Sequence, residues 1–316
     1  MTSLLRRARV RRAIPVEKKS RALRVFLDIN ALSGLLNDDQ PLPSAVLAER
    51  CRQANVELVL SFSNVAPLVE SDDSAEAVAA RGDALQRFSL LYIRHAVIPE
   101  NELRAAVTAF GEGHDPPAVD PYADAFYGDY EARHDTFDDV ILKIDAERTL
   151  RFAGMRQRLL QLLTDKQGFG FSDEEQRRLR DEIHGQGEAA WDKHRFRRIV
   201  QRWLALARIE MPEADLPRFE DWLHEKASRA PAWRLFVESF RTLLADDPEA
   251  PNRTDIYDFS NLTIAPYVDA MVLPERVINF AAKAQRRLMR TEPDLDLLRH
   301  LHPDAVSALR ATGVAL

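Results

Sequence analysis

The apolar and polar positions follow strand-like and helix-like patterns at both ends of the chain and helix-like patterns in its middle. Short continuous apolar runs predict buried strands, and they lie at 23–27, 56–61, 92–98 and 268–273. Apolar residues spaced three or four apart predict helices, and near these strands they cover 31–36, 45–54, 74–91 and 277–288. Strands alternating with helices are typical of an α/β fold with a parallel sheet.

The middle of the chain has a different character. Residues 112–139 are acidic and rich in Pro and Gly, which predicts a long surface excursion. Five helical patterns follow, at 150–163, 173–184, 189–209, 216–227 and 233–244. Residues 293–316 predict one or two closing helices, with Pro303-Asp304 opening the last.

These patterns divide the chain into three regions. We predict a basic arm at 1–22, an α/β domain built from 23–98 and 250–316, and a helical insertion at 99–249. The alternative of two independent domains is less favourable, because the second α/β piece has too few strands to fold alone.

The composition favours a soluble protein with a packed core. Of the 316 residues 46% are hydrophobic, and the mean hydropathy is −0.33. No stretch approaches the apolar length of a membrane span, and the basic first residues lack the apolar region of a secretory signal. Cys51 is the single cysteine, which excludes an internal disulfide framework and a cysteine-rich zinc site. We expect a cytoplasmic protein without a membrane partner.

The net charge of −6 conceals an uneven distribution. Residues 1–24 contain nine Arg and Lys residues against Glu17 alone, so this segment carries +8 and the rest carries −14. A basic arm on an acidic body can bind phosphates. A solvated, disordered N-terminus is the other interpretation, and the sequence leaves both open.

Carboxylates lie beside the predicted strands. Asp28 directly follows the first strand, and Glu70 lies in the helical segment after the second. The acids around the fourth strand are Asp255, Asp258, Asp269 and Glu275. An α/β sheet binds ligands at the carboxyl ends of its strands, and Mg²⁺ or Mn²⁺ takes oxygen ligands. Crowded carboxylates would repel one another without a cation, so we predict a divalent metal site.

Each of these acids also has a simpler interpretation. Asp28 and Asp255 could cap the helices that follow them, and Asn30 could do the same. Glu70 alone is typical of a solvated helix residue. If all the acids are caps or surface residues of a helical interaction protein, they would lie more than about 10 Å apart, too far to share a metal ion.

Three motifs, in order along the chain, resemble the PIN-like nuclease superfamily. The first is Val25-Phe26-Leu27-Asp28-Ile29-Asn30-Ala31-Leu32, a strand followed by Asp-x-Asn. The second is the strand at 56–61 with Pro67-Leu68-Val69-Glu70 after it, and the third runs from Asp258 through Val272. Together they cover about a third of the chain. The resemblance implies a three-layer α/β fold with a central parallel sheet and Mg²⁺- or Mn²⁺-dependent cleavage of RNA.

The resemblance also assigns roles to the acids. Asp28, Glu70, Asp258 and Asp269 would form the catalytic, metal-binding quartet, with Glu275 as a further ligand and Asp255 competing with Asp258. Asn30 would orient Asp28 and contact RNA. The expected activity is a metal-dependent endoribonuclease that hydrolyses RNA phosphodiester bonds.

This chain departs from the family pattern in two places. It has Leu273-Pro274-Glu275 where the family often has Thr-x-Asp, and the insertion at 99–249 is large. These departures leave a second hypothesis open, in which the protein is an inactive PIN-like module that binds RNA or protein. The helical insertion would then be the surface for a protein partner or for a second copy of the chain.

A stripe of basic residues near the C-terminal end of the chain bears on the predicted RNA binding. The helix at 277–288 and the residues after it carry Lys283, Arg286, Arg287 and Arg290. Such a stripe could steer a phosphate backbone toward the acids without reading its sequence. The predicted partner is therefore RNA, with single-stranded RNA as one form.

Overall fold

The computed structural model describes most of the chain outside one long central gap. The described residues are 21–36, 42–61, 64–65, 75–123, 126–128, 132–134, 193–246, 258–298 and 300–316. The basic arm up to residue 20 and the helices predicted at 150–163 and 173–184 lie outside these ranges.

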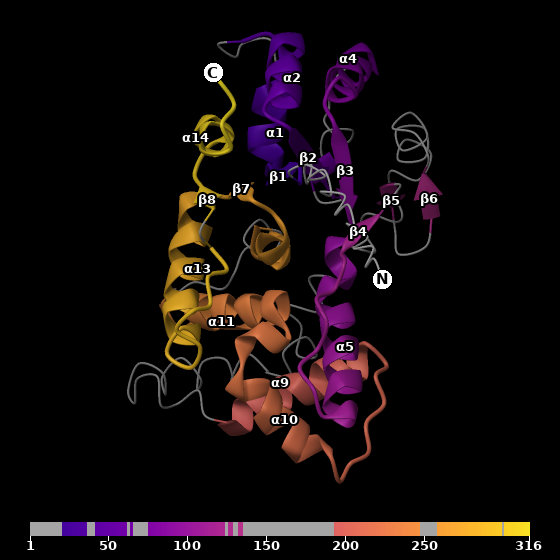
Figure 1. The fold of residues 1–316 in the computed structure, drawn as a ribbon, viewed down its shortest axis with the longest axis vertical. Helices are drawn as coiled ribbons and strands as arrows, with labels where there is room; N and C mark the ends of the chain where they lie inside the picture. Colours follow the sequence, from indigo (N-terminus) through magenta and orange to yellow (C-terminus); the bar gives the residue numbers. More distant parts are fainter. Residues whose placement is uncertain are drawn as a thin grey trace, which may run out of the picture.

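A six-stranded, mostly parallel sheet forms the centre of the molecule (Figure 1). Its strands, in spatial order, are β4 (Tyr122–Ala123), β3 (Leu90–Ile93), β2 (Val56–Leu60), β1 (Leu23–Phe26), β7 (Ala270–Val272) and β8 (Leu301–His302). Every neighbouring pair is parallel except β3 and β4. A separate antiparallel pair joins β5 (Phe126–Gly128) and β6 (Ala132–His134). The predicted α/β class is confirmed, and β1 pairs with β7, so the two distant sequence pieces share one sheet.

Helices cover both faces of this sheet. The first face carries α1 (Ile29–Leu36), α2 (Ser44–Gln53), α4 (Ala75–Leu85) and α14 (Ala305–Ala311). The second carries α5 (Ile98–Glu112), α9 (Lys193–Leu206), α10 (Leu216–Glu225), α11 (Pro231–Asp246) and α13 (Glu275–Leu288). Short 3₁₀ turns η1 (His95–Val97), η3 (Ala227–Arg229) and η4 (Leu262–Tyr267) also lie along this second layer's connections.

Alternation along the strands divides the apolar residues between two cores. Val25 and Leu27 pack with α1 and α2, while Phe26 between them packs with the helices of the second face. Ala270 and Met271 divide in the same way on β7. Because both faces of the sheet are covered, its strands are continuous apolar runs, the pattern from which they were predicted.

The described part of the predicted insertion belongs to the second core. Tyr122–Ala123 adds an edge strand to the sheet, and Trp233 of α11 is fully buried with Phe26 of β1 in one cluster. Figure 1 shows α9 and α10 together at the end of the molecule away from α2 and α14, with α5 running lengthwise between the sheet and this group. These helices therefore extend the layer over the sheet.

Several element boundaries differ from the sequence prediction. The helix predicted to reach residue 91 ends at Leu85, and β3 begins at Leu90 instead of residue 92. A turn at 86–88 separates the two, since Gln86, Arg87 and Phe88 donate their N–H groups to the last carbonyls of α4. β4 and β8 were missed because each has only two residues. The prediction that Pro303-Asp304 opens the last helix is confirmed, because Asp304 caps α14.

Candidate functional site

The strand order reverses beside β1. The chain continues from β1 to β2 and β3 on one side, whereas β7 and β8 return on the other side. In open α/β sheets, ligands bind outside the carboxyl ends of the strands at such a reversal. Asp28 lies there, two residues after the end of β1.

Asp28 is a buried carboxylate. It is 6% exposed, and its Oδ1 accepts the N–H of Ala31 at 2.8 Å, so it caps α1. Burial raises the pKa of Asp28 and the Ala31 hydrogen bond lowers it, with burial the larger effect. Within the described ranges no basic side chain pairs with it. A cation bound at this edge would favour the ionised carboxylate.

Asn64 holds the end of β1 in place. Its Nδ2 donates to the carbonyl of Leu27 at 2.9 Å, and its Oδ1 accepts the N–H of Ser61 at 2.9 Å. Asn64 is 1% exposed, so both hydrogen bonds are shielded from water. It thereby ties the carboxyl end of β2 to the residue before Asp28. This role was not predicted from the sequence, where its local signal is an Asn four residues after the end of β2.

We expect Asn64→Leu to lower the free energy of unfolding by about 2–4 kcal/mol, because two buried backbone groups lose their partners at roughly 1–3 kcal/mol each. Urea unfolding followed by circular dichroism measures this change. Gln53→Leu is the matched control, since Gln53 is exposed and donates to Glu49 on the surface of α2, and we expect a change within about 0.5 kcal/mol. Equal effects of the two substitutions would contradict the role given to Asn64.

Glu275 lies at the same edge of the sheet as Asp28. Phe26 pairs with Met271 in parallel register, so Asp28 is level with Leu273, two residues before Glu275. Glu275 is exposed and is the first residue of α13. It remains a candidate ligand on this edge.

Asp258 begins the helical segment that leads back to β7. The helical segment from 258 to 267 returns the chain to the start of β7, and Thr263 Oγ1 within it donates to the carbonyl of His95 at 3.5 Å. Because His95 follows the carboxyl end of β3, this segment passes that edge at Thr263, five residues after Asp258. Glu70 and Asp255 are outside the described residues.

Asp269 lies at the opposite edge, which corrects its predicted place beside Asp28. Its N–H donates to the carbonyl of Arg24, four residues before Asp28 on the parallel neighbour. Four strand residues span about 13 Å. The Asp269 carboxylate accepts the backbone N–H of Arg24 at 2.9 Å and pairs with Arg21 at 2.7 Å. Asp28 and Asp269 therefore do not share a metal ion.

The structure also corrects the predicted roles of two RNA-contacting residues, Asn30 and Arg287. Asn30 is exposed and forms no hydrogen bond with Asp28, so it does not orient that carboxylate. Arg287 faces α11, where it donates to the Glu238 carbonyl at 3.1 Å and to the Thr242 hydroxyl. Lys283 and Arg286 are exposed on α13, and Arg290 is exposed in the turn after it. The stripe that can face solvent therefore consists of these three residues.

The described acids do not form a ready-made metal cage. In the ranges that the structure covers, no three His, Cys, Asp or Glu side chains are grouped closely enough to hold an ion. Mg²⁺ usually takes one or two carboxylates and completes its shell with waters and substrate phosphates. Asp28 with one further acid would therefore fit such an ion at this edge.

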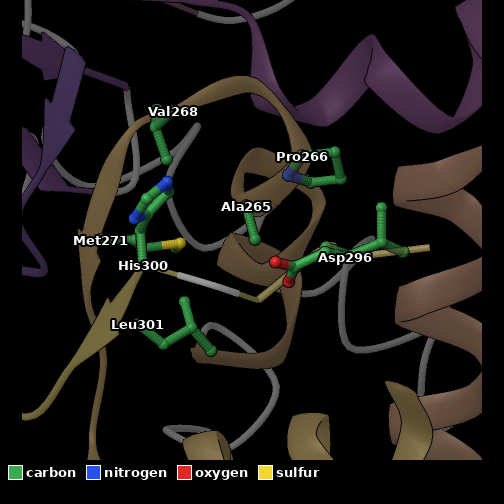
Figure 2. Close-up of a pocket in the computed structure, with 8 residues that line it drawn as sticks. Ala265, Pro266, Val268, Met271, Asp296, His300 and Leu301 are labelled. Atoms are coloured by element: carbon green, nitrogen blue, oxygen red, sulfur yellow. The ribbon is translucent and has the colours of Figure 1, made fainter. Parts of the chain in front are cut away.

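A small cavity under the start of β7 offers little room. Figure 2 shows Asp296 and His300 beside Met271, Val268 and Pro266, which line it. Its volume is about 40 Å³, room for little more than ordered water. It is not a site for a substrate.

Comparison with known proteins gives no relative. No family model, curated protein or solved structure matches this chain. Function must therefore be argued from the site alone. Among the described helices, none is long and apolar enough to cross a membrane.

Proposed function

We propose that the protein is a PIN-like, metal-dependent endoribonuclease whose site lies at the carboxyl edge of the sheet around Asp28. The observation that carries the proposal is the Asp28 carboxylate, which is buried beside the strand-order reversal without a basic partner among the described residues. A carboxylate in this environment favours a bound cation. The ordered motifs that resemble PIN-like nucleases specify which reaction is proposed.

The proposed site combines Asp28 with a second carboxylate as ligands of the metal ion. Asp28 would be the fixed ligand, because Ala31 and Asn64 hold it and the residue before it. Glu275, Asp258 and Glu70 are the candidates for the second carboxylate. A bound Mg²⁺ or Mn²⁺ supplies charge stabilisation at the scissile phosphate and an acidified water. The protein's part is to fix the carboxylates and to bind the RNA backbone.

The basic stripe is placed to bind that backbone. Lys283 and Arg286 are exposed on α13, the helix that begins at Glu275, and Arg290 is exposed just after it. Contacts from such residues to phosphates carry no sequence information and weaken as salt rises. We therefore expect RNA binding with little sequence preference.

Calorimetric titration with Mn²⁺ tests the proposed site directly. We expect one binding event in the tens of micromolar or tighter, because Asp28 is preorganised and at least one more acid lies at its edge. The titration is repeated with Asp28→Asn, which keeps the helix cap and removes the charge. Binding that the substitution leaves unchanged would place the metal elsewhere.

An inactive PIN-like module is the second candidate. It is favoured by the ion pair of Asp269 with Arg21, which removes one predicted ligand, and by Leu273-Pro274-Glu275 at the end of β7. In this case the helices of the second face would bind RNA or a protein partner. Absence of Mn²⁺ binding together with retained RNA binding would support the module over the nuclease.

A further inference from the structure

A larger pocket lies beside the amino ends of β1 and β7 and reaches the loop before β4. Its volume is about 340 Å³, within the range of about 300–1,000 Å³ that is usual for small-molecule sites. The polar lining includes Arg21, Arg24, Asp120, Tyr122 and Asp269. It is formed by the start of β1, the loop leading into β4, and the connection from η4 to β7.

Arg24 contributes a positive charge to this pocket. Its backbone N–H bonds to Asp269, but no carboxylate in the described ranges forms an ion pair with its guanidinium. The Nε atom is buried and has no hydrogen-bond partner among the described residues. A half-buried guanidinium with an unsatisfied donor costs free energy unless an anion meets it.

Tyr122 fixes the position of that guanidinium. The Arg24 Cζ lies 3.9 Å from the centroid of the Tyr122 ring, a cation–π contact. The Tyr122 hydroxyl in turn donates to the carbonyl of Tyr267. A planar guanidinium held in this way retains donors suited to phosphate.

The two acids of the pocket are already engaged. Asp120 accepts the N–H of Tyr122 at 3.1 Å, and Asp269 accepts the N–H of Arg24 and pairs with Arg21. The Arg21 side chain is 58% exposed, and exposed ion pairs contribute little stability. Arg21 can therefore turn toward a ligand at small cost. The basic arm, with seven Arg and Lys residues against Glu17 in residues 1–20, joins the chain directly before Arg21.

We propose that this pocket binds a phosphate ester of nucleotide size. The phosphate is bound by Arg24 and Arg21, and the organic part packs on an apolar wall that includes Val119, Pro121 and Pro266. Within the pocket, Arg24 and Asp269 lie about four strand residues, or about 13 Å, from Asp28. This proposal is independent of the proposed nuclease activity, because it uses neither the metal nor Asp28.

Calorimetry with adenosine 5′-monophosphate, ribose 5-phosphate and adenosine tests the proposal on the full chain in EDTA. We expect both phosphate esters to bind and adenosine to bind at least tenfold more weakly, since the phosphate provides the anchor. The nucleotide binding more tightly than ribose 5-phosphate would show that the base occupies the apolar wall. Equal affinities would limit the recognised group to the sugar phosphate.

Arg24→Gln is expected to weaken nucleotide binding at least tenfold, and Arg21→Gln to weaken it by a smaller factor. Arg310→Gln, an exposed arginine on α14, is the control and should leave the affinity unchanged. Circular dichroism checks that each variant is folded. If Arg24→Gln does not fold, the affinity of Arg21→Gln for the nucleotide still tests the proposal, because the Arg21 side chain is exposed.

Three results would overturn the proposal. The first is wild-type protein that binds the nucleotide no better than adenosine at millimolar concentration. The second is unchanged affinity in both folded arginine variants. The third is nucleotide binding that disappears in EDTA and returns with Mn²⁺, which would assign it to the metal site.

Discussion

Asp28→Asn is expected to lower Mn²⁺-dependent cleavage of RNA by at least about 100-fold while leaving the fold intact. The amide is as good a helix cap as the carboxylate, so the hydrogen bond from Ala31 survives. Only the negative charge is lost, and with it the strongest attraction for a divalent ion. Cleavage of a fluorescent RNA oligonucleotide at saturating Mn²⁺ measures the effect, and thermal unfolding checks the fold.

Asp304→Asn provides a control of the same chemistry. Asp304 follows β8 and caps α14 through the N–H of Ser307 at 2.8 Å, so it resembles Asp28 in local structure. It differs in being exposed at the outer strand, away from the reversal beside β1. We expect this variant to cleave RNA at the wild-type rate. Undiminished cleavage by pure Asp28→Asn would show that Asp28 is only a cap.

Strand direction explains why one predicted ligand was misplaced. In a parallel sheet, an acid that follows a strand lies at the carboxyl edge, and an acid that precedes a strand lies at the amino edge. Asp28 follows β1, whereas Asp269 precedes β7. The sequence pattern located both acids beside strands correctly. The two acids cannot share a site, because β7 runs parallel to β1 and Asp269 stands at its start. Glu275 follows β7 and therefore lies at the carboxyl edge with Asp28.

Other features depend on contacts that a local pattern does not encode. Buried strands such as β1 and β2 were predictable because both faces are covered and all their residues except Arg24 and Glu57 are apolar. β4 and β8 are two residues long, and only their pairing with β3 and β7 identifies them as strands. Likewise, Arg287 lies in a basic run of the sequence, and its contacts with α11 turn it inward.

Glu102 anchors the helical layer to the connection before β7. It is 2% exposed, and its carboxylate accepts the N–H groups of Ala232 at 3.0 Å and Trp233 at 2.9 Å. The hydroxyl of Tyr267 donates to it at 2.5 Å. One side chain on α5 thus satisfies the first turn of α11 and holds the residue that also contacts Tyr122.

We expect Glu102→Leu to lower the free energy of unfolding by about 3–5 kcal/mol, since two buried N–H groups and the half-buried Tyr267 hydroxyl would lose their acceptor at roughly 1–3 kcal/mol each, partly relieved by relaxation. Urea unfolding measures the change. Glu112→Leu, at the exposed end of the same helix, is the control and should change stability by no more than about 0.5 kcal/mol. A loss below about 1 kcal/mol for Glu102→Leu would contradict the anchoring role, because the extrapolation of unfolding free energies is uncertain by about that amount.

The protonation of Glu102 makes this contribution depend on pH. Burial raises the pKa of Glu102 from 4.5 to about 7, against the lowering effect of its three hydrogen bonds. Between these two values the folded protein retains a proton that the unfolded chain has released. The stabilisation from this proton is complete below the unfolded pKa and is lost as the pH rises to about 7, by up to about 3 kcal/mol.

Glu102→Gln isolates this effect, because glutamine does not titrate. Burial lowers the pKa of His95 to about 4, which acts in the opposite direction below its ordinary value of 6.5. That contribution is present in both proteins and cancels in their difference. We therefore expect the stability of the wild type relative to Glu102→Gln to fall steadily from about pH 5 to about pH 7 and then to level off. A difference that stays constant across this range would mean that Glu102 is ionised throughout, held by the first turn of α11.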